Sequence, residues 1–372
     1  MKFKIKKSIF TKKLIDTERA ISSKTTIPVL TGIKLSAEDT TLTLTGSNAD
    51  ISIETSTNNV EIIEEGTIVL PARFFIEIIK KLPEEDILIS INENLQASIE
   101  SGSTKFSING LDPNTYPTLP IVDTKNGFVI NGKKLKDIID TTVIATSKQE
   151  SRPILTGIHF IINNQKLIAV STDSHRLSQV EETGENLVDK LYDVVIPGRA
   201  MLELSRMIDE KEDINVSISE NQVLFIFKET KFYSRLLEGM YPDTTHLIPE
   251  ESTTHLLIDG PTLLSSIDRA SLLSHAGRNN VVKLSISDIN SNVVLSSNSP
   301  DVGLVEESLN FDSIVGEDIE ISFNPDYLRD ALRVLGQGKI NLGFTTPLRP
   351  FTLKNEDNGK QIVELITPIR TY

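Results

Sequence analysis

The chain has 372 residues, a hydrophobic content of 38%, a charged content of 24% and no cysteine. These values are typical of a soluble chain with two or three domains, and they exclude disulfides, thiolate metal sites and cysteine nucleophiles. No apolar run approaches the roughly 18 residues of a membrane-spanning helix, so we expect a cytoplasmic protein without a membrane contact. The net charge of −14 argues against a polyanionic partner unless basic side chains are concentrated in one region.

Basic and acidic side chains are segregated near the N-terminus. Residues 1–24 carry eight basic side chains and two acidic ones, whereas residues 36–66 carry seven acidic side chains and no basic one. This segregation predicts that one face of the first domain is positive and another negative. The alternative is that the N-terminal lysines are solvated side chains without a role.

The first predicted element is a half-buried strand over residues 1–7, where lysine alternates with apolar residues in a way that no signal peptide does. Two helical stripes of apolar residues follow, the clearer one after Pro71. The stripes consist of Phe10, Leu14, Ile15 and Ile21, and of Phe74, Phe75, Ile78, Ile79 and Leu82. Alternating β-branched residues predict strands at 42–44, 51–53, 87–91 and 105–108. The fold class is therefore α+β, with two helices laid against antiparallel sheet.

This unit occurs three times. Residues 28–33 (PVLTGI) recur as 153–158 (PILTGI) at an offset of 125, and Tyr116-Pro117 recurs as Tyr241-Pro242 at the same offset. A fainter third copy aligns residues 44–50 with 295–301, and the helices predicted after Pro71 and Pro197 match residues 324–332. The repeats predict three domains, residues 1–125, 128–250 and 254–372, separated by polar, turn-prone segments. The sheet edges left at the two chain ends call for a second molecule.

No constellation of residues suggests catalysis. The five histidines lack ligand spacing, so neither a metal site nor a cofactor is predicted. Asp173, Ser174 and His175 are adjacent, but neighbours on an extended segment point to opposite faces, which disfavours a catalytic relay. Residues 336–339 (GQGK) lack the spacing of a phosphate loop and are predicted to end a helix. We expect a protein without catalytic residues, with a hydrolase at Asp173–His175 as an alternative.

The three copies, together with residues 171–177 (STDSHRL), 239–242 (GMYP) and 365–372 (LITPIRTY), resemble the bacterial sliding-clamp family, the beta subunits of DNA polymerase III. The low aromatic content and the final Arg-Thr-Tyr resemble its Gram-positive branch. The resemblance covers the whole chain and implies a homodimeric ring of six domains joined head to tail, with helices lining the hole. The third copy disfavours a two-domain, three-chain clamp of eukaryotic type. A repetitive α+β scaffold that does not encircle DNA stays as the alternative.

The resemblance implies sequence-independent contacts with double-stranded DNA inside the hole. Contacts with phosphates carry no sequence information, so many weak ones allow a ring to slide. The residues implied nearest DNA are Lys24, Arg73, Gln149, Arg152 and Arg199. Further basic residues implied on the inner face are Lys133, Lys134, Lys136 and Arg206.

The resemblance also implies a pocket, between the second and third repeats, for short linear peptides of the polymerase alpha subunit, the clamp loader and repair proteins. Its implied residues are Leu155, Thr172, His175, Arg176, Leu177, Pro242, His246, Leu247, Asn324, Tyr327, Pro368, Ile369 and Arg370. For Leu155 and Leu177 the alternative is ordinary core. His246 and Thr367 depart from the family pattern, which leaves the preferred peptide open.

The contact between the two chains is implied to involve the first repeat of one chain and the third repeat of the other. The implied residues are Lys105 and Phe106 in the first repeat, and Leu272, Leu273 and Glu306 in the third. Lys105 is expected to face Glu306 or Glu307 of the second chain.

Overall fold

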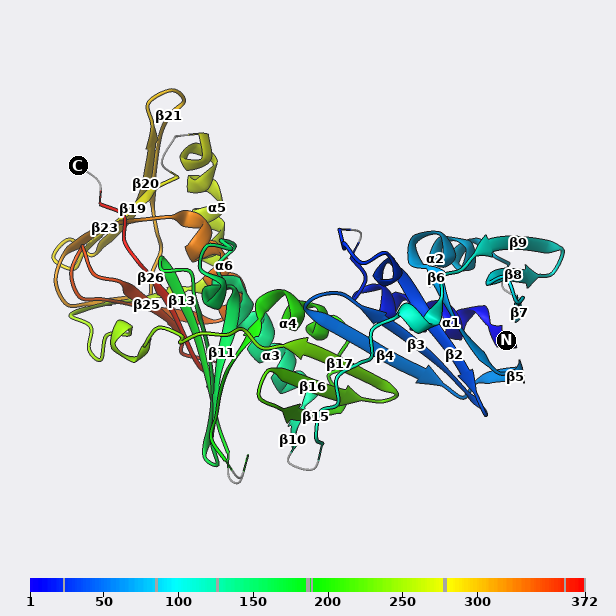
Figure 1. Ribbon diagram of the computed structural model, residues 1–372. Coiled ribbons are helices and arrows are strands. Elements are labelled where there is room, and N and C mark those ends of the chain that lie inside the picture. The colour runs from blue at the N-terminus through cyan, green and yellow to red at the C-terminus, as the bar shows by residue number, and fades with distance from the viewer. Residues whose placement is uncertain are drawn as a thin grey trace. The chain divides into compact units, whose positions relative to one another are not determined.

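A computed structural model describes residues 1–22, 24–83, 86–124, 127–184, 188, 190–276, 280–357 and 359–370. The chain forms two compact units, Met1–Leu135 with Arg199–Leu236, and Lys136–Gly198 with Leu237–Tyr372 (Figure 1). Each unit contains one terminal repeat together with the part of the central repeat that shares its sheet. No helix in the described parts of the chain combines the length and the hydropathy that crossing a membrane requires.

The first unit consists of two antiparallel sheets and helices. One sheet has the order β5-β1-β7-β8-β9, and the other has the order β10-β15-β16-β17-β4-β3-β2-β6. The strands are β1 (Lys2–Lys6), β2 (Gly32–Glu38), β3 (Thr41–Ser47), β4 (Ile51–Thr57), β5 (Val60–Glu64), β6 (Gly66–Pro71), β7 (Asp86–Ile91), β8 (Gln96–Ser101), β9 (Thr104–Asn109), β10 (Phe128–Asn131), β15 (Asp213–Ile218), β16 (Gln222–Phe227) and β17 (Thr230–Arg235). The helices are α1 (Lys7–Glu18) and α2 (Ala72–Lys81), with the short η1 (Pro28–Thr31) and η2 (Pro113–Thr115). Helices α3 (Gly132–Thr142) and α4 (Gly198–Ser205) are divided between the units.

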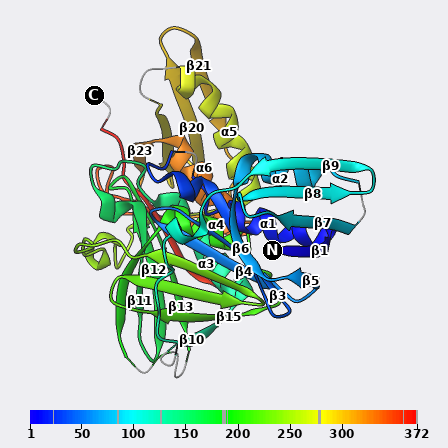
Figure 2. The ribbon, with the colours of Figure 1, turned by 45° about the vertical axis from the view of Figure 1, so that its right-hand side comes forward.

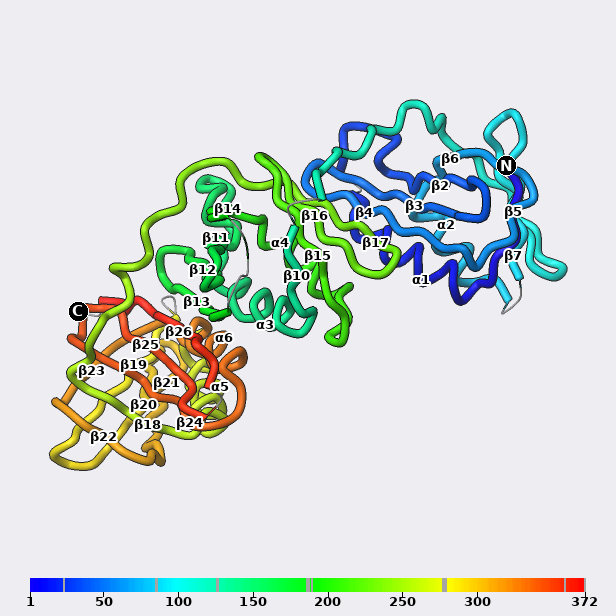
Figure 3. Tube along the Cα trace, turned by 90° about the horizontal axis from the view of Figure 1, so that it is seen from below, coloured from blue at the N-terminus to red at the C-terminus, as the bar shows by residue number. Residues whose placement is uncertain are grey.

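The second unit repeats this plan. Its sheets have the orders β14-β11-β12-β13-β26-β25-β24-β18-β22 and β21-β20-β19-β23. The strands are β11 (Gly157–Ile162), β12 (Lys166–Thr172), β13 (Arg176–Thr183), β14 (Tyr192–Pro197), β18 (Thr254–Asp259), β19 (Val282–Ser287), β20 (Asn292–Ser299), β21 (Gly303–Ser308), β22 (Ser313–Val315), β23 (Ile319–Phe323), β24 (Lys339–Phe344), β25 (Phe351–Asn355) and β26 (Gln361–Ile366). The helices are α5 (Gly260–Ala276) and α6 (Pro325–Leu335), with the short η3 (Val143–Ala145), η4 (Pro153–Thr156) and η5 (Thr245–Leu247). In Figure 3, β26 runs beside β13, which joins the last repeat to the central one.

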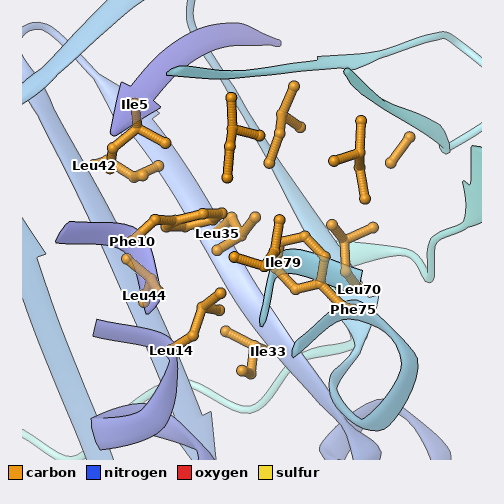
Figure 4. Close-up of a cluster of buried hydrophobic side chains, with 14 of the residues drawn as sticks. Ile5, Phe10, Leu14, Ile33, Leu35, Leu42, Leu44, Leu70, Phe75 and Ile79 are labelled. Carbon is orange, nitrogen blue, oxygen red and sulfur yellow. The ribbon is translucent and has the colours of Figure 1, made fainter. Parts of the chain in front are cut away.

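The core of the first repeat lies between its helices and both sheets of the unit. Phe10 and Leu14 of α1 and Phe75 and Ile79 of α2 point toward apolar residues of the strands (Figure 4). Those strand residues include Ile5, Ile33, Leu35, Leu42, Leu44, Leu70, Ile87, Ile89 and Ile99. Because successive strand residues alternate between faces, the apolar positions predicted from the sequence fall on one side of each sheet. The predicted strands at 1–7, 42–44, 51–53, 87–91 and 105–108 are confirmed.

Both predicted helical stripes are wrong in part. In α1 the side chain of Ile15 is 37% exposed, Thr17 is buried in its stead, and Ile21 lies beyond the end of the helix. In α2 the side chain of Phe74 is 66% exposed, whereas Ile76 is buried. Each helix packs one face on the core, and these two apolar side chains lie on the opposite side. The predicted third-repeat helix is confirmed as α6, which begins at the Asn324 cap and ends at Gly336, whose φ of 75° suits glycine.

Two antiparallel strand pairs join the repeats inside the chain, and we call them the internal seams. At the first seam β4 pairs with β17, and at the second β13 pairs with β26. Strands β9 and β21 each lie at an edge of a sheet; Figure 2 shows β9 beside β8 at the edge of the five-stranded sheet. The second unit therefore combines central and C-terminal residues in one continuous sheet, where the predicted peptide-binding residues also lie.

Candidate partner-binding site

The second internal seam ends at a tight turn between β12 and β13. The Asp173 carboxylate accepts hydrogen bonds from the backbone N–H groups of His175 and Arg176, at 2.9 and 3.1 Å. Ser174, at the centre of this turn, has a φ of 79°, which residues with a side chain rarely adopt. The Ser174 hydroxyl accepts a hydrogen bond from Arg152 at 2.9 Å. This geometry does not support the alternative of a hydrolase. The Asp173 carboxylate accepts backbone hydrogen bonds within the turn, and the Ser174 hydroxyl is hydrogen bonded to Arg152 and not to a histidine.

Arg176 organises the surface beside this turn. Its Nε donates to Asp173 at 3.1 Å, and its Nη1 donates to Asp330 of α6 at 2.7 Å. The guanidinium also lies over the ring of Tyr327, 4.6 Å from the centroid, and the His175 ring stacks on Tyr327 at 6.4 Å. Two carboxylates and an aromatic face therefore hold Arg176, whose side chain is only 11% exposed. Arg176 thus holds Tyr327 and the turn in place, and these two hydrogen bonds engage two of its nitrogens.

The C-terminal segment closes one side of this surface. Beyond β26, the backbone N–H of Thr367 donates to the carbonyl of His175, and that of Ile369 donates to the carbonyl of Ser322. Pro368 and Ile369 are half-buried, and Arg370 is exposed. The two backbone bonds tie these residues to the turn and to β23, so the segment has a defined place beside Arg176.

The segment from Pro242 to Leu247 carries the other predicted residues of this surface. Pro242, His246 and Leu247 are exposed, with Leu247 at 45%. Tyr241, just before them, is buried, and its hydroxyl accepts a hydrogen bond from the backbone N–H of Thr172 at 3.0 Å. Burial raises the pKa of the Tyr241 hydroxyl to about 12, so it stays protonated at neutral pH. The anchored Tyr241 holds the exposed segment near the end of β12.

Leu155 and Leu177 lie beneath the surface rather than on it. Both are buried in one core cluster with Val170, Tyr241 and Leu365. They support the site from the core, which was the alternative given for them above. Around them, Thr172 donates through its hydroxyl to the Arg176 carbonyl, and Asn324 accepts from the Asp326 N–H as the cap of α6. The predicted residues Thr172, His175, Arg176 and Tyr327 lie together around this turn, with Arg152, which was predicted near DNA, and with Asp173 and Asp330, which were not predicted for the site.

A buried acid lies at the second seam. Glu364 of β26 is 3% exposed and pairs in register with Ser178 of β13, whose hydroxyl donates to the Glu364 carboxyl at 2.6 Å. Burial raises the pKa of Glu364 well above its ordinary value, against the lowering influence of the Ser178 bond and the nearby Arg176. Exclusion of water thus favours the neutral form of this carboxyl in the folded chain.

The residues predicted near DNA are exposed in both units. Lys24, Arg73 and Arg199 are exposed in the first unit, and Gln149 and Arg152 are exposed in the second. Lys133, Lys134 and Arg206 are also exposed, whereas Lys136 is half-buried. Arg206 pairs with Glu203, which also binds Arg19 at 2.8 Å. These residues stay predicted DNA contacts.

The residues predicted for the contact between chains lie at exposed edges. Phe106 on the edge strand β9 is 40% exposed, and Leu272 on α5 is 71% exposed, while Leu273 is half-buried. Lys105 forms an ion pair with Glu100 at 2.7 Å within the chain. Glu307 binds Arg269 and, at 2.8 Å, the Ser266 hydroxyl, whereas Glu306 points to the exposed side of β21.

The roles of two residues in this region were missed in the sequence, because Asp173 and Asp330 hold Arg176. A polar turn of the form Thr-Asp-Ser could have indicated that Asp173 accepts backbone hydrogen bonds. No local pattern marks Asp330, because it lies 154 positions from Arg176 along the chain.

Comparisons with known proteins agree with this architecture over the whole chain. Family models of the DNA polymerase III beta subunit match residues 1–120 (N-terminal domain), 129–243 (central domain) and 245–370 (C-terminal domain). The beta sliding clamps of Staphylococcus epidermidis and Bacillus subtilis are each 44% identical to the chain, with all of both proteins covered.

Solved structures of sliding clamps have the same fold as this chain. The crystal structure of the Bacillus subtilis sliding clamp superimposes over the full length of both chains with a TM-score of 0.96. A Pseudomonas aeruginosa sliding clamp bound to griselimycin is 25% identical, with a TM-score of 0.92 and full coverage of both chains. The predicted α+β fold of three clamp domains and its resemblance to Gram-positive clamps are confirmed. The chain belongs to the DNA polymerase III beta-subunit family, the bacterial sliding clamps.

Proposed function

We propose that two copies of the chain close head to tail into a ring around double-stranded DNA, in the cytoplasm, and tether the replicative polymerase to it. As a member of the sliding-clamp family the chain is a non-catalytic accessory subunit of a DNA polymerase. The observation that supports closure into a ring is that β9 and β21 each lie at the edge of a sheet. Their counterparts in the other repeats form the internal seams, so each edge lacks the kind of partner that a second copy would supply.

The charge distribution in the first unit supports the proposed passage of DNA along helices. Lys12, Lys24 and Arg73 are exposed on or just after α1 and α2. The acidic side chains of residues 36–66 belong instead to β2, β4, β5 and their turns. A net-negative chain can hold a polyanion when its positive side chains lie together, and salt then weakens the contact.

Retention on circular DNA is the direct test. Clamps loaded onto nicked circular DNA by a clamp loader should stay bound through gel filtration at high salt, because a closed ring cannot leave a closed circle. Cutting the circle should release them, since the phosphate contacts alone are weak at that salt. Equal loss from circular and linear DNA would contradict encirclement and favour the scaffold alternative.

The site around Arg176 is proposed to bind short linear peptides of the polymerase alpha subunit, the clamp loader and repair proteins. Exposed apolar side chains beside a fixed aromatic and cationic cluster suit the apolar and polar anchors of such a peptide. A Pseudomonas aeruginosa clamp of the same fold binds griselimycin, so griselimycin is a suitable probe for testing whether this chain binds a ligand at the site around Arg176.

Leu247→Ala should weaken griselimycin binding roughly 10-fold, because it removes an exposed apolar anchor without leaving a buried cavity. Isothermal titration calorimetry measures the dissociation constant directly. The matched control is Leu348→Ala, another exposed leucine of the same unit at 62% exposure, which should bind as the unaltered chain does. An unchanged affinity for Leu247→Ala would remove this residue from the site.

A further inference from the structure

The buried Tyr241, which anchors the segment that begins at Pro242, has a basic side chain against its ring. The ring centroid of His159, on β11, lies 4.7 Å from that of Tyr241, and the two ring planes are tilted by 31°. His159 is 8% exposed, and its Nε2 lies 2.7 Å from the Asp193 carboxylate of β14. Because a carboxylate can only accept, the imidazole N–H donates to it. His159 is thus fixed by Asp193 while its ring lies against Tyr241.

Strand pairing brings these side chains to one face of the sheet. In β11 His159 pairs with Val195 of β14, and Ile161, two residues further on, pairs with Asp193. Since residues two apart on a strand point to the same face, His159 and Asp193 are diagonal neighbours. Val195 packs with Tyr241 in one core cluster. The pairing of β11 with β14 therefore places both His159 and Asp193 on the side of the sheet that carries Tyr241.

The first repeat has the same arrangement at the offset of 125. Lys34 of β2 stands at the place of His159. Its Nζ lies over the ring of Tyr116, the counterpart of Tyr241, at 6.0 Å from the centroid. Tyr116 is also buried, and its hydroxyl donates to the Thr45 carbonyl at 3.2 Å. Two repeats thus hold a buried tyrosine with a basic side chain placed against its ring.

The third repeat lacks both members of this pair. At the offset of 251 that aligns residues 44–50 with 295–301, Ser285 stands in place of the lysine. At the same offset Thr367 stands in place of the tyrosine, although the proline that follows is kept. The basic residue and the tyrosine are therefore present together in two repeats and absent together in the third. This agreement favours a role of His159 toward Tyr241 over an unrelated role in β11.

Tyr241 connects this contact to the surface around Arg176. Its hydroxyl accepts a hydrogen bond from the backbone N–H of Thr172 at 3.0 Å. Thr172 is buried at the end of β12, and its own hydroxyl donates to the Arg176 carbonyl at 2.7 Å. In the other direction along the chain, Tyr241 leads directly into the exposed residues 242–247. A shift of the Tyr241 ring would therefore displace both the turn and the exposed segment.

We propose that His159 is a positioning residue of the peptide site, which holds Tyr241 in place through its own pair with Asp193. The inference rests on the proposed binding of peptides and adds a residue that acts from beneath the surface. Binding sites keep their geometry when a second layer of residues locks the side chains that shape them. Without His159, a ligand has to order the turn and the exposed segment as it binds, and this ordering lowers the affinity.

Three substitutions at His159 separate positioning from the filling of space, with griselimycin binding measured by isothermal titration calorimetry. His159→Ala should raise the dissociation constant roughly 5-fold, an effect of the size found between side chains in contact. His159→Lys should restore the affinity to within about 2-fold, because a lysine can lie over the ring as Lys34 does and reach the exposed Asp193 carboxylate. His159→Leu fills the space without a basic group and should bind as weakly as His159→Ala.

The first repeat provides the matched control. Lys34→Ala removes the equivalent side chain from the Tyr116 ring, in the unit that does not contain the proposed peptide site. It should leave the dissociation constant for griselimycin unchanged. All four variants should keep the mass of the unaltered chain in light scattering. If His159→Ala does not fold, the comparison of His159→Lys with His159→Leu, which both fill the space, carries the same test.

Fluorine NMR of chain labelled with 3-fluorotyrosine follows Tyr241 directly. The chain has six tyrosines, and the resonance of Tyr241 is the one that Tyr241→Phe removes. His159→Ala should shift and broaden this resonance, because the imidazole beside the ring is lost. His159→Lys should give a single sharp resonance again, as expected for a ring that is held in one position.

The outcomes distinguish this inference from the proposed peptide site itself. Equal affinities for His159→Ala and the unaltered chain would overturn the positioning role and leave the peptide site intact. Recovery of affinity in His159→Leu but not in His159→Lys would also overturn it, since filling the space would then be sufficient. If the unaltered chain does not bind griselimycin, the proposed site around Arg176 is wrong, and the role of His159 in it is wrong as well.

Discussion

Leu272→Ala combined with Leu273→Ala should convert the dimer into monomers. Leu272 is 71% exposed in the isolated chain, so its truncation removes contact area between copies with little cost to the fold. Each truncation of a central apolar anchor costs about 2 kcal/mol. Two such losses weaken one contact roughly 1,000-fold, and the ring makes the contact twice. Light scattering at micromolar concentration measures the resulting mass.

Leu348→Ala is the control for this double variant. It removes a leucine of similar exposure, 62%, from the same unit, and should leave the dimer mass unchanged. The double variant should also fail to remain on nicked circular DNA, since an open ring has no topological hold. A dimer that persists at the same concentration would place the contact elsewhere on the chain.

Glu364→Gln should stabilise the protein, and the gain should increase with pH. The carboxyl is buried at the second seam, and its pKa is raised well above the ordinary 4.5 because water is excluded from it. A glutamine keeps the shape and can accept the Ser178 hydrogen bond, but it never acquires a charge. Each pH unit between the ordinary and the raised pKa of Glu364 is worth about 1.4 kcal/mol, and we expect a gain of at least this size at pH 8.

The sign of the pH dependence follows from proton binding. The folded chain holds a proton on Glu364 at pH values where the unfolded chain has released it, so stability falls as pH rises above 4.5. The fall ends at the pKa of the folded state. Glutamine lacks this contribution, so the two proteins should converge near pH 4.5 and diverge above it. Thermal unfolding at fixed protein concentration between pH 5 and 9 measures the difference.

Glu320→Gln is the matched control for the Glu364 prediction. Glu320 lies on the exposed face of β23, so its replacement should leave the pH profile close to that of the unaltered chain. If the stability of Glu364→Gln changed with pH between 5 and 9 in the same way as that of the unaltered chain, Glu364 would be ionised in the folded state.

The threefold repeat and five strands of the first repeat could be predicted from the sequence, because their signals are local. Apolar and polar residues alternate with a period of two in β3, β4 and β7, and residues 28–33 reappear almost unchanged at 153–158. The helical stripes were less accurate, because α1 and α2 bear apolar residues on two faces. Only packing shows that Phe10 faces the core while Phe74 does not.

The arrangement around Arg176 could not be predicted in the same way. The sequence resemblance placed Arg176, Tyr327 and His175 in one site, but the hydrogen bonds that position Arg176 come from Asp173 and Asp330. The bond to Asp330 depends on how α6 packs beside β13, and this packing cannot be predicted from the sequence because the two residues are 154 positions apart. Similarly, Glu364 stands in an alternating strand pattern and is charged in isolation, yet it is buried by pairing with Ser178.

The Glu364–Ser178 pair also disfavours non-native strand pairing between the three similar repeats during folding. Strand β26 carries an acid where β9 and β17 carry Phe106 and Phe232. Were β26 to add to β4, Glu364 would meet Ile53 and lose its hydroxyl donor in an apolar environment, a cost of several kcal/mol. Tandem copies that swap strands are prone to tangled, aggregating products. The buried Glu364 therefore makes pairing of β26 with β13 more favourable than pairing of β26 with β4.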